Sequence, residues 1–162
     1  MDNKNTTPIK LDAEQLKKYE PNVYPLLFLD RITECVPGEY AKGFKNFTNN
    51  EWFFPKHYVG HPIVPAAVQN EAMSQMLTVA LLTSLDVDNI DVEARTWNAT
   101  FFREIVPGDR LELEAHVESY KRGVCKGNVV GSVDGNICCE LKATIIVPEE
   151  FNKYLPKRKT DE

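Results

Sequence analysis

A histidine and a glutamate are the residues of this sequence best suited to acid–base chemistry. His57 lies in a stretch rich in aromatic residues, proline and glycine, and Glu71 lies in the apolar stretch that follows it. A histidine can take up a proton near physiological pH, and a carboxyl group can deliver one. Together they could remove a proton from carbon and protonate a departing hydroxyl group.

Glu71 stands out because it is the only ionisable residue between His61 and Asp86. A carboxylate on a mostly apolar helix is costly unless it is paired or used. Gln75, one turn later on the same helix face, could hold its orientation. The alternative is that Glu71, Gln75 and Thr78 form the solvated stripe of an amphipathic helix.

The other histidines and the cysteines favour neither a metal site nor a disulfide. We interpret His61 as a loop residue and His116 as a surface or hydrogen-bonded histidine in a strand. The four cysteines lack zinc-site spacing and companion histidines. Cys138 and Cys139 are adjacent in an apparent strand and should face opposite sides of the sheet. We therefore expect no metal, and buried free thiols in a reducing compartment.

Composition predicts one domain. The 162 residues with 43% hydrophobic content can close a core, and the net charge of -5 argues against a nucleic-acid partner. The polar start shows no secretory or transit signal, and the longest apolar run, around residues 76–82, is far shorter than the ~20 residues that span a bilayer. We expect a cytoplasmic protein without a membrane partner, folded as one domain over residues 1–162, with loose tails at 1–10 and 152–162.

One long helix and several strands must position the candidate residues. Pro65 suits the first position of a helix over residues 65–85, whose apolar residues cover so much of its circumference that it must be buried. A capping box at Asp12 and Gln15 predicts a short helix through residue 18. Strands are predicted at 30–36, 39–47, 95–105, 110–121, 124–133 and 136–147, joined in part by turns at 37–38, 107–109 and 134–135. The sequence thus predicts an α+β domain in which an antiparallel sheet wraps one central helix, with the strand order left open.

The residues around the histidine also carry a family resemblance. The stretch NEWFFPKHYVGHPIVPAAVQNEAMSQ at residues 50–75 resembles the signature of bacterial-type 3-hydroxyacyl-acyl-carrier-protein dehydratases. That signature is Asn-Glu-x-Phe-Phe, a catalytic His, a Gly-x-Pro-x-x-Pro turn, and a Glu-Ala-x-x-Gln helix whose Glu is the second catalytic residue. His57 and Glu71 match the two catalytic positions at the family's spacing of fourteen. Later segments such as VPGDRL at 106–111 extend the resemblance over about residues 22–147.

The resemblance implies a hot-dog fold and the dehydration of a 3-hydroxyacyl thioester to the trans-2-enoyl thioester, in fatty acid or related acyl-chain biosynthesis. His57 would act as base and Glu71 as acid, with no cofactor. The acyl group would be carried on the phosphopantetheine of an acyl carrier protein or of coenzyme A. Ala66, where the family has glycine, would donate its backbone N–H to the thioester oxygen, and Gly60 and Gln75 would complete the substrate site.

The resemblance also implies a homodimer or an assembly of dimers, because in the family the histidine of one subunit faces the glutamate of its partner. A free sheet edge, which proteins usually pair or cover, gives a physical motive for the same assembly. Basic residues at 121, 122, 126 and 153–159 could receive an acidic carrier protein, or could simply be scattered solvating charges.

Two other functions stay open within the same fold. A hot-dog thioesterase would direct water at the carbonyl carbon with a carboxylate in a different place. A non-catalytic acyl-binding or assembly subunit would lose the His and Glu, and both are present here. The aromatic residues Phe53, Phe54, Trp97, Phe101 and Phe102 could line a tunnel, but the core is the commoner place for such side chains.

Overall fold

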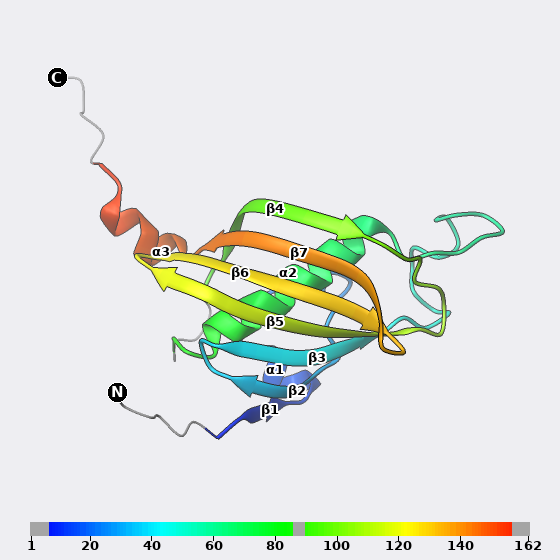
Figure 1. Cartoon of the computed structure of the whole chain (residues 1–162), viewed down its shortest axis with the longest axis horizontal. Helices are drawn as coiled ribbons and strands as arrows, with labels where there is room; N and C mark the ends of the chain where they lie inside the picture. The colour runs from blue at the N-terminus through cyan, green and yellow to red at the C-terminus, as the bar shows by residue number, and fades with distance from the viewer. Residues whose placement is uncertain (1–6, 86–89, 157–162) are drawn as a thin grey trace.

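A seven-stranded antiparallel sheet curls around one long helix, α2 (Ala66–Leu82) (Figure 1). The structure, a computed structural model, describes residues 7–85 and 90–156. The strand order is β1-β2-β3-β5-β6-β7-β4, and every neighbouring pair is antiparallel. The strands are β1 (Ile9–Leu11), β2 (Arg31–Val36), β3 (Tyr40–Asn46), β4 (Glu93–Phe101), β5 (Arg110–Lys121), β6 (Val124–Val133) and β7 (Asn136–Ile146). The predicted wrapped arrangement is confirmed.

Close packing of the sheet on α2 builds the core. The α2 residues from Ala72 to Leu82 are all buried. A Cβ atom added at Gly127 of β6 would lie 2.5 Å from the Cδ1 atom of Leu77 and 2.5 Å from the carbonyl oxygen of His116. Only glycine therefore lets β6 approach α2 and β5 this closely.

The turns predicted from the sequence set the strand pairing. Gly38 joins β2 to β3 with a φ of 76°, and Asp134 and Gly135 join β6 to β7 with φ values of 49° and 78°. Positive φ at both central residues gives a hairpin turn whose twist matches that of the strands. The hairpin and the β5-β6-β7 meander are thus as predicted, whereas the placement of β4 at the sheet edge beyond β7 was not readable from the sequence.

The boundaries of the long helix, of one strand and of both tails differ from the prediction. Pro65 is the N-cap of α2 and not its first helical residue, with extended ψ of 141°, and the helix ends at Leu82 and not near residue 85. The strand predicted at 95–105 is β4 and spans Glu93–Phe101. The predicted tails are shorter, because β1 uses residues 9–11, and α3 (Pro148–Phe151) continues into a 3-10 turn (Asn152–Tyr154). Residues 1–6 and 157–162 of those tails lie outside the described residues.

The short helix α1 (Ala13–Leu16) forms where the capping box predicts it. The Asp12 side chain accepts hydrogen bonds from the backbone of Glu14 and Gln15, and the Gln15 side chain bonds back to the Asp12 backbone. Leu16 is fully buried and anchors the segment on the core. None of the helices in the described ranges is long and apolar enough to cross a membrane.

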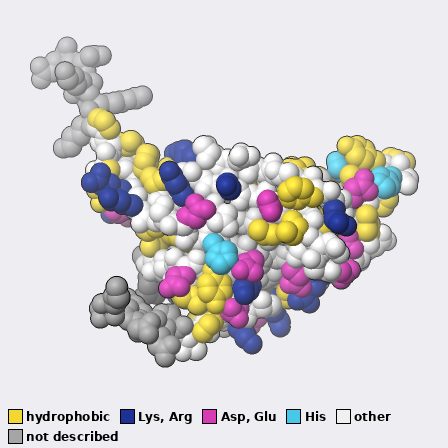
Figure 2. Space-filling model, in the orientation of Figure 1, with side chains coloured by type: hydrophobic (Ala, Val, Ile, Leu, Met, Phe, Trp, Pro, Cys, Tyr) yellow, Lys and Arg dark blue, Asp and Glu magenta, His cyan; other side chains and the backbone are white. Residues whose placement is uncertain are grey.

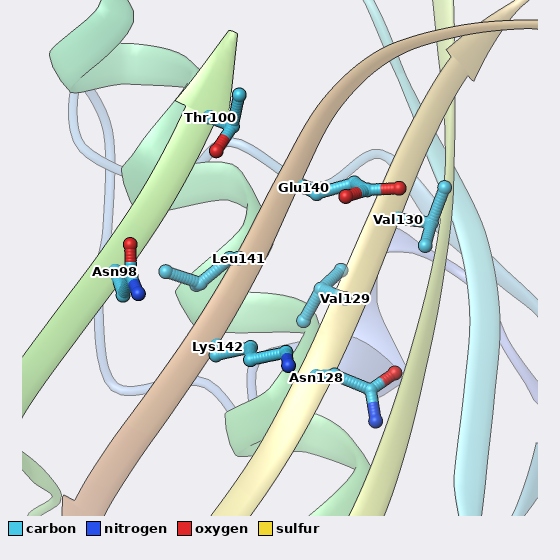
Figure 3. A pocket seen from close by; sticks show the side chains of 8 residues that line it. All are labelled: Asn98, Thr100, Asn128, Val129, Val130, Glu140, Leu141 and Lys142. Carbon is cyan, nitrogen blue, oxygen red and sulfur yellow. The ribbon is translucent and has the colours of Figure 1, made fainter.

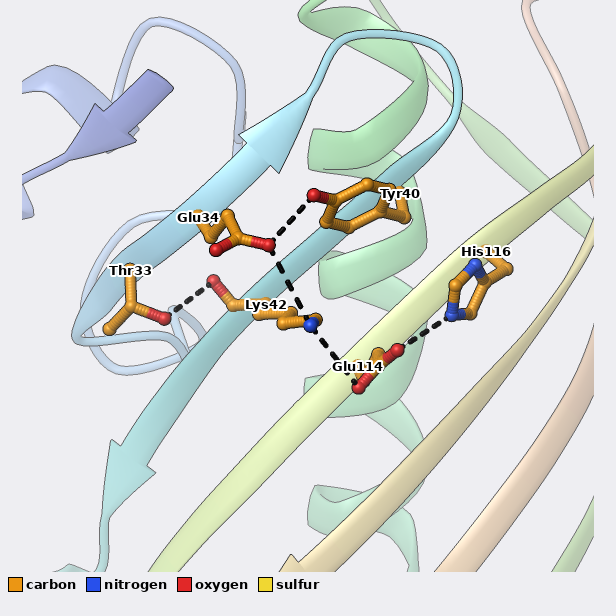
Figure 4. Close-up of polar contacts among 6 residues, drawn as sticks. All are labelled: Thr33, Glu34, Tyr40, Lys42, Glu114 and His116. Carbon is orange, nitrogen blue, oxygen red and sulfur yellow. Dashed lines mark hydrogen bonds and ion pairs between the residues drawn. The ribbon is translucent and has the colours of Figure 1, made fainter. Parts of the chain in front are cut away.

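Polar side chains cross-link β2, β3 and β5 on the solvent face of the sheet (Figure 4). The Tyr40 hydroxyl donates to Glu34 at 2.7 Å, and this bond is the main reason that the pKa of Glu34 lies below its ordinary value. Glu114 contacts His116 at 2.8 Å and Lys42 at 4.0 Å. His116 is thus a surface histidine with a polar partner, as predicted, and lies apart from His57.

Candidate active site

His57 lies in the loop between β3 and α2 and is held in one orientation. Its Nδ1 atom lies 3.1 Å from the carbonyl oxygen of Ile63. Because a carbonyl oxygen only accepts, Nδ1 must carry the proton, which leaves the lone pair of Nε2 free to act as a base. Two backbone bonds support the loop: the His57 N–H donates to the Phe53 carbonyl, and the Ile63 N–H donates to the His57 carbonyl. Phe53 is buried and anchors this turn in the core.

The loop presents apolar and histidine side chains together at one end of the molecule (Figure 2). Tyr58 stacks on the imidazole of His57 with ring centroids 4.3 Å apart, and Tyr58 is 58% exposed. The turn between Tyr58 and His61 is closed by reciprocal backbone bonds, and Gly60 within it has a φ of 80°. Gly60 therefore shapes the turn, and it does not line the pocket described next.

An open pocket of about 340 Å³ joins His57 to the start of α2 and to the chain just after β4. Its walls are His57, Tyr58, Ile63, Val64, Ala66, Gln69, Phe101, Phe102, Arg103 and Glu104. Among the described residues, the N–H groups of Ala66 and Ala67 have no acceptor. Free N–H groups at the positive end of a helix suit an oxygen on which negative charge develops. Ala66 thus lines the same pocket as His57, and its role in substrate binding stays a prediction.

Glu71 sits farther along α2 and is fixed by Gln75. The Gln75 Nε2 atom donates to Glu71 Oε1 at 3.0 Å and to the Leu26 carbonyl at 2.7 Å. The Phe28 N–H donates to Gln75 Oε1 at 2.8 Å. Gln75 and Thr78 are 1% and 6% exposed, so the interpretation of this face as a solvated stripe is wrong.

The two oxygens of the Glu71 carboxyl group have different surroundings. Oε1 accepts from Gln75, and the Nδ2 atom of Asn22 lies 3.4 Å from it. Within the described part of the chain, no hydrogen bond to Oε2 occurs. Because N–H donors face Oε1, Oε2 is the oxygen of this carboxyl group that remains open to a further hydrogen-bond partner.

A second carboxyl group, Glu20, lies beside Glu71 and was not singled out from the sequence. Glu20 is only 2% exposed, and its Oε1 accepts from the backbone N–H of Asn22 at 3.0 Å and from Asn22 Nδ2 at 2.6 Å. Its Oε2 is buried without a partner. Burial, with a smaller contribution from the nearby Glu71 charge, raises the pKa of Glu20 to about 7.

Within one chain, the structure does not bring His57 and Glu71 into one pocket. Glu71 is not part of the pocket that His57 lines, and no hydrogen bond or ion pair in the described ranges joins the two. His61 turns outward and bonds Glu104 at 3.0 Å, as expected of a loop residue.

The predicted aromatic residues divide into two groups. Phe53 and Phe54 are buried in the core. Trp97, Phe101 and Phe102 are 46%, 40% and 54% exposed, so a core position is wrong for these three. They lie on or just after β4, whose outer edge has no neighbouring strand in the described sheet. Sequence reasoning missed their exposure because it could not place β4 at an edge.

Two other hollows on the surface have no histidine among the residues that line them. One lies on the solvent face of β4, β6 and β7, where Glu140 and Lys142 are its only charged side chains (Figure 3). Another holds the predicted basic residues Lys121, Arg122 and Lys153, but also Glu149 and Glu150.

The basic hollow also lies far from the histidine. It sits at the end of β5 remote from the His57 loop (Figure 1), and twelve strand residues span roughly 40 Å. Lys157 to Lys159 fall outside the described residues. These positions do not support a carrier-binding patch beside the site.

The four cysteines are buried and free, as predicted. Across residues 7–85 and 90–156, no group of three or more His, Cys, Asp or Glu side chains is arranged to hold a metal ion.

Comparison with known proteins places these residues in a family. A family model described as a FabA-like domain matches residues 20–142. The 3-hydroxyacyl-[acyl-carrier-protein] dehydratase FabZ of Bacillus subtilis strain 168 is 36% identical over 140 residues, covering 86% of this chain and 99% of that protein. The FabZ of Bacillus pumilus strain SAFR-032 is 37% identical over 138 residues, covering 85% of this chain and 96% of that protein.

Solved structures share the fold at low sequence identity. The dehydratase heterocomplex ApeI:P from Xenorhabdus doucetiae matches with a TM-score of 0.70 and 13% identity, covering 88% of this chain and 97% of the matched chain. A hypothetical thioesterase with coenzyme A from Streptococcus pneumoniae TIGR4 matches with a TM-score of 0.58 and 11% identity, covering 72% of this chain and 83% of the matched chain. Together with the wrapped sheet, these matches confirm the hot-dog fold.

The buried carboxyl group of Glu20 predicts an unusual dependence of stability on pH. Its pKa of about 7 in the folded protein exceeds the ordinary value of 4.5, so its contribution to stability is complete below pH 4.5 and is lost as the pH rises through 7. Glu20→Gln should therefore raise the free energy of unfolding by about 3 kcal/mol at pH 8 and by less than about 1 kcal/mol at pH 5. Urea unfolding at both pH values measures the difference. The matched control is Glu14→Gln, an exposed position, which should change little at either pH; an equal gain at both pH values for Glu20→Gln would contradict the assignment.

Proposed function

The chain belongs to the 3-hydroxyacyl-[acyl-carrier-protein] dehydratase family, and from this premise we propose how it removes water from a 3-hydroxyacyl thioester. The enzyme is a hydro-lyase of fatty acid biosynthesis whose product is the trans-2-enoyl thioester. The mechanism rests on the hydrogen bonds of two side chains. The bond at Nδ1 of His57 leaves its Nε2 free to accept a proton, and the bond at Oε1 of Glu71 leaves its Oε2 free to donate one.

The reaction begins at C2 of the substrate. Nε2 of His57 takes the C2 proton, and the electrons of that C–H bond form the C2–C3 double bond. The C3–O bond breaks while Glu71 Oε2 gives its proton to the hydroxyl oxygen, which leaves as water. His57 ends protonated and Glu71 ionised, and the transfer of one proton through solvent restores both.

The start of α2 stabilises the charge that develops during proton removal. Loss of the C2 proton shifts negative charge onto the thioester oxygen, and donors aimed at that oxygen lower the barrier. Two observations support this role: Ala66 lines the same pocket as His57, and the N–H groups of Ala66 and of the next residue, Ala67, have no acceptor among the described residues. Gln75 acts by orienting Glu71, and Gly60 acts through the shape of the loop. The mechanism calls for no metal or cofactor.

The acyl group arrives on the phosphopantetheine of an acyl carrier protein. The names of the relatives support a carrier-bound substrate, and coenzyme A thioesters share the same chemical arm. The four buried free thiols suit a reducing compartment, which supports a cytoplasmic location.

The active unit is a homodimer in which His57 of one chain meets Glu71 of its partner. Two observations support this arrangement: Glu71 does not line the pocket of His57 within one chain, and β4, at the edge of the described sheet, exposes Trp97 and Phe101. Apolar strand edges of this kind are usually paired or covered. A two-fold axis would complete two sites at once.

The product of the purified enzyme tests the function. With a 3-hydroxyacyl-carrier substrate, mass spectrometry should show loss of one water and a trans-2-enoyl product, unaffected by a chelator. His57→Ala and Glu71→Gln should each lower kcat roughly 10²-fold or more, because each removes one proton-transfer group. The exposed His116→Ala is the matched control and should retain normal turnover. Free acid as the sole product would replace dehydration with hydrolysis, and wild-type rates in a folded Glu71→Gln variant would remove Glu71 from the mechanism.

Mixed dimers test the shared site. Inactive His57→Ala and inactive Glu71→Gln chains, unfolded and refolded together, should form hybrids with one intact site and one doubly altered site. If hybrids make up half of the dimers, activity should return to about a quarter of that of the wild type. Mass spectrometry of the intact complexes verifies mixing. Proven hybrids without activity would place both residues of each site in one chain.

A further inference from the structure

Glu20 is a buried carboxyl group to which the mechanism above gives no task. It is 2% exposed, and its Oε2 atom is buried without a hydrogen-bond partner. A buried ionisable group is costly, and such groups concentrate where function needs them. Its neighbours are Asn22 and Glu71, so this costly group lies beside the proposed acid.

Asn22 connects the two carboxyl groups. Its Nδ2 atom lies 2.6 Å from Glu20 Oε1 and 3.4 Å from Glu71 Oε1, so one amide nitrogen faces both. The backbone N–H of Asn22 also donates to Glu20 Oε1, at 3.0 Å, which fixes the asparagine by two bonds. The contact to Glu71 is long, as catalytic hydrogen bonds often are before substrate binds.

We propose that Glu20 is a positioning residue of the active site, which holds Asn22 so that its amide orients the Glu71 carboxyl group. With Asn22 and Gln75 both directed at Oε1, the proton of Glu71 is kept on Oε2, the atom that faces the leaving hydroxyl group. The inference rests on the proposed dehydration.

The charge of Glu20 adds a pH dependence to this arrangement. Glu71 on α2 is the ionisable group whose charge acts on Glu20, while Asn22 and Gln75 are uncharged. Burial, with a smaller contribution from the Glu71 charge, raises the pKa of Glu20 to about 7, so Glu20 gains its charge within the pH range of an assay. Because Glu20→Gln cannot ionise, it should remove from the kcat profile the change that the wild type shows near pH 7.

Three variants and one control distinguish a positioning role of Glu20 from a purely structural one. Glu20→Leu removes the acceptor that holds Asn22, Glu20→Gln keeps an acceptor oxygen but cannot ionise, and Asn22→Ala removes the bridge. Glu14→Leu, an exposed glutamate in the preceding helix, is the matched control. For each full-length protein, kcat and KM are measured from pH 5 to 9 with one 3-hydroxyacyl thioester, beside the thermal midpoint and circular dichroism.

Glu20→Leu and Asn22→Ala should each lower kcat roughly tenfold, because misplacing a catalytic group slows the reaction, with KM changed less than about twofold. A variant that combines Glu20→Leu with Asn22→Ala should be no slower than Asn22→Ala alone, since both changes break the same link from Glu20 through Asn22 to Glu71. Glu20→Gln should recover most of kcat at pH 6 and should lack the change in kcat that the wild type shows near pH 7.

Normal kcat and an unshifted profile in the Glu20 variants, with an active wild type, would overturn the positioning role and leave the proposed function standing. A loss of kcat that follows a lowered thermal midpoint, without recovery in Glu20→Gln, would overturn it as well. If Glu20→Leu does not fold, Asn22→Ala and Glu20→Gln decide the question. A wild type that forms no enoyl product from any 3-hydroxyacyl thioester would instead refute the proposed function.

Discussion

The structure depends on the hydrogen bonds that hold the Glu71 carboxyl group on the buried helix α2. Gln75 solves this problem by using both amide hydrogens and its oxygen: Nε2 reaches Glu71 and the Leu26 carbonyl, and Oε1 accepts from the Phe28 N–H. A buried amide with every partner in place stabilises the fold, whereas one lost partner would leave a costly unpaired group. The same side chain therefore ties the chain leading into β2 to α2 and orients the proposed acid.

His57 is held in place in a different way from Glu71. The hydrogen bonds that position His57 come from backbone atoms, of Ile63 and Phe53, and the partly exposed ring of Tyr58 stacks on its imidazole. The loop ends where α2 begins, so the imidazole and the free N–H groups of the helix start share one pocket. In the proposed mechanism, the rigid helix α2 supplies both the charge-stabilising donors at its start and the acid farther along it.

The sequence predicted those parts of the fold that rest on local chemistry. The capping box at Asp12, the turns at Gly38 and Gly135, and the i, i+4 pair of Glu71 and Gln75 all depend on neighbouring residues, and all are present. The strand order, the exposed aromatic residues of β4 and the strand β1 depend on long-range packing, and the sequence did not reveal them. Glu20 and Asn22 escaped notice for the same reason, because only the packing of their segment against α2 brings them to Glu71.

In the proposed mechanism, His57 and Glu71 act on opposite ends of one C–C bond. The most direct measurement is a crystal structure with a stable 3-hydroxyacyl pantetheine analogue bound. We expect C2 to lie within about 3.5 Å of His57 Nε2 and the 3-hydroxyl group to lie within hydrogen-bond reach of Glu71 Oε2, with the two side chains contributed by different chains. A bound analogue whose 3-hydroxyl group lies out of reach of Glu71, directly or through one water, would contradict it.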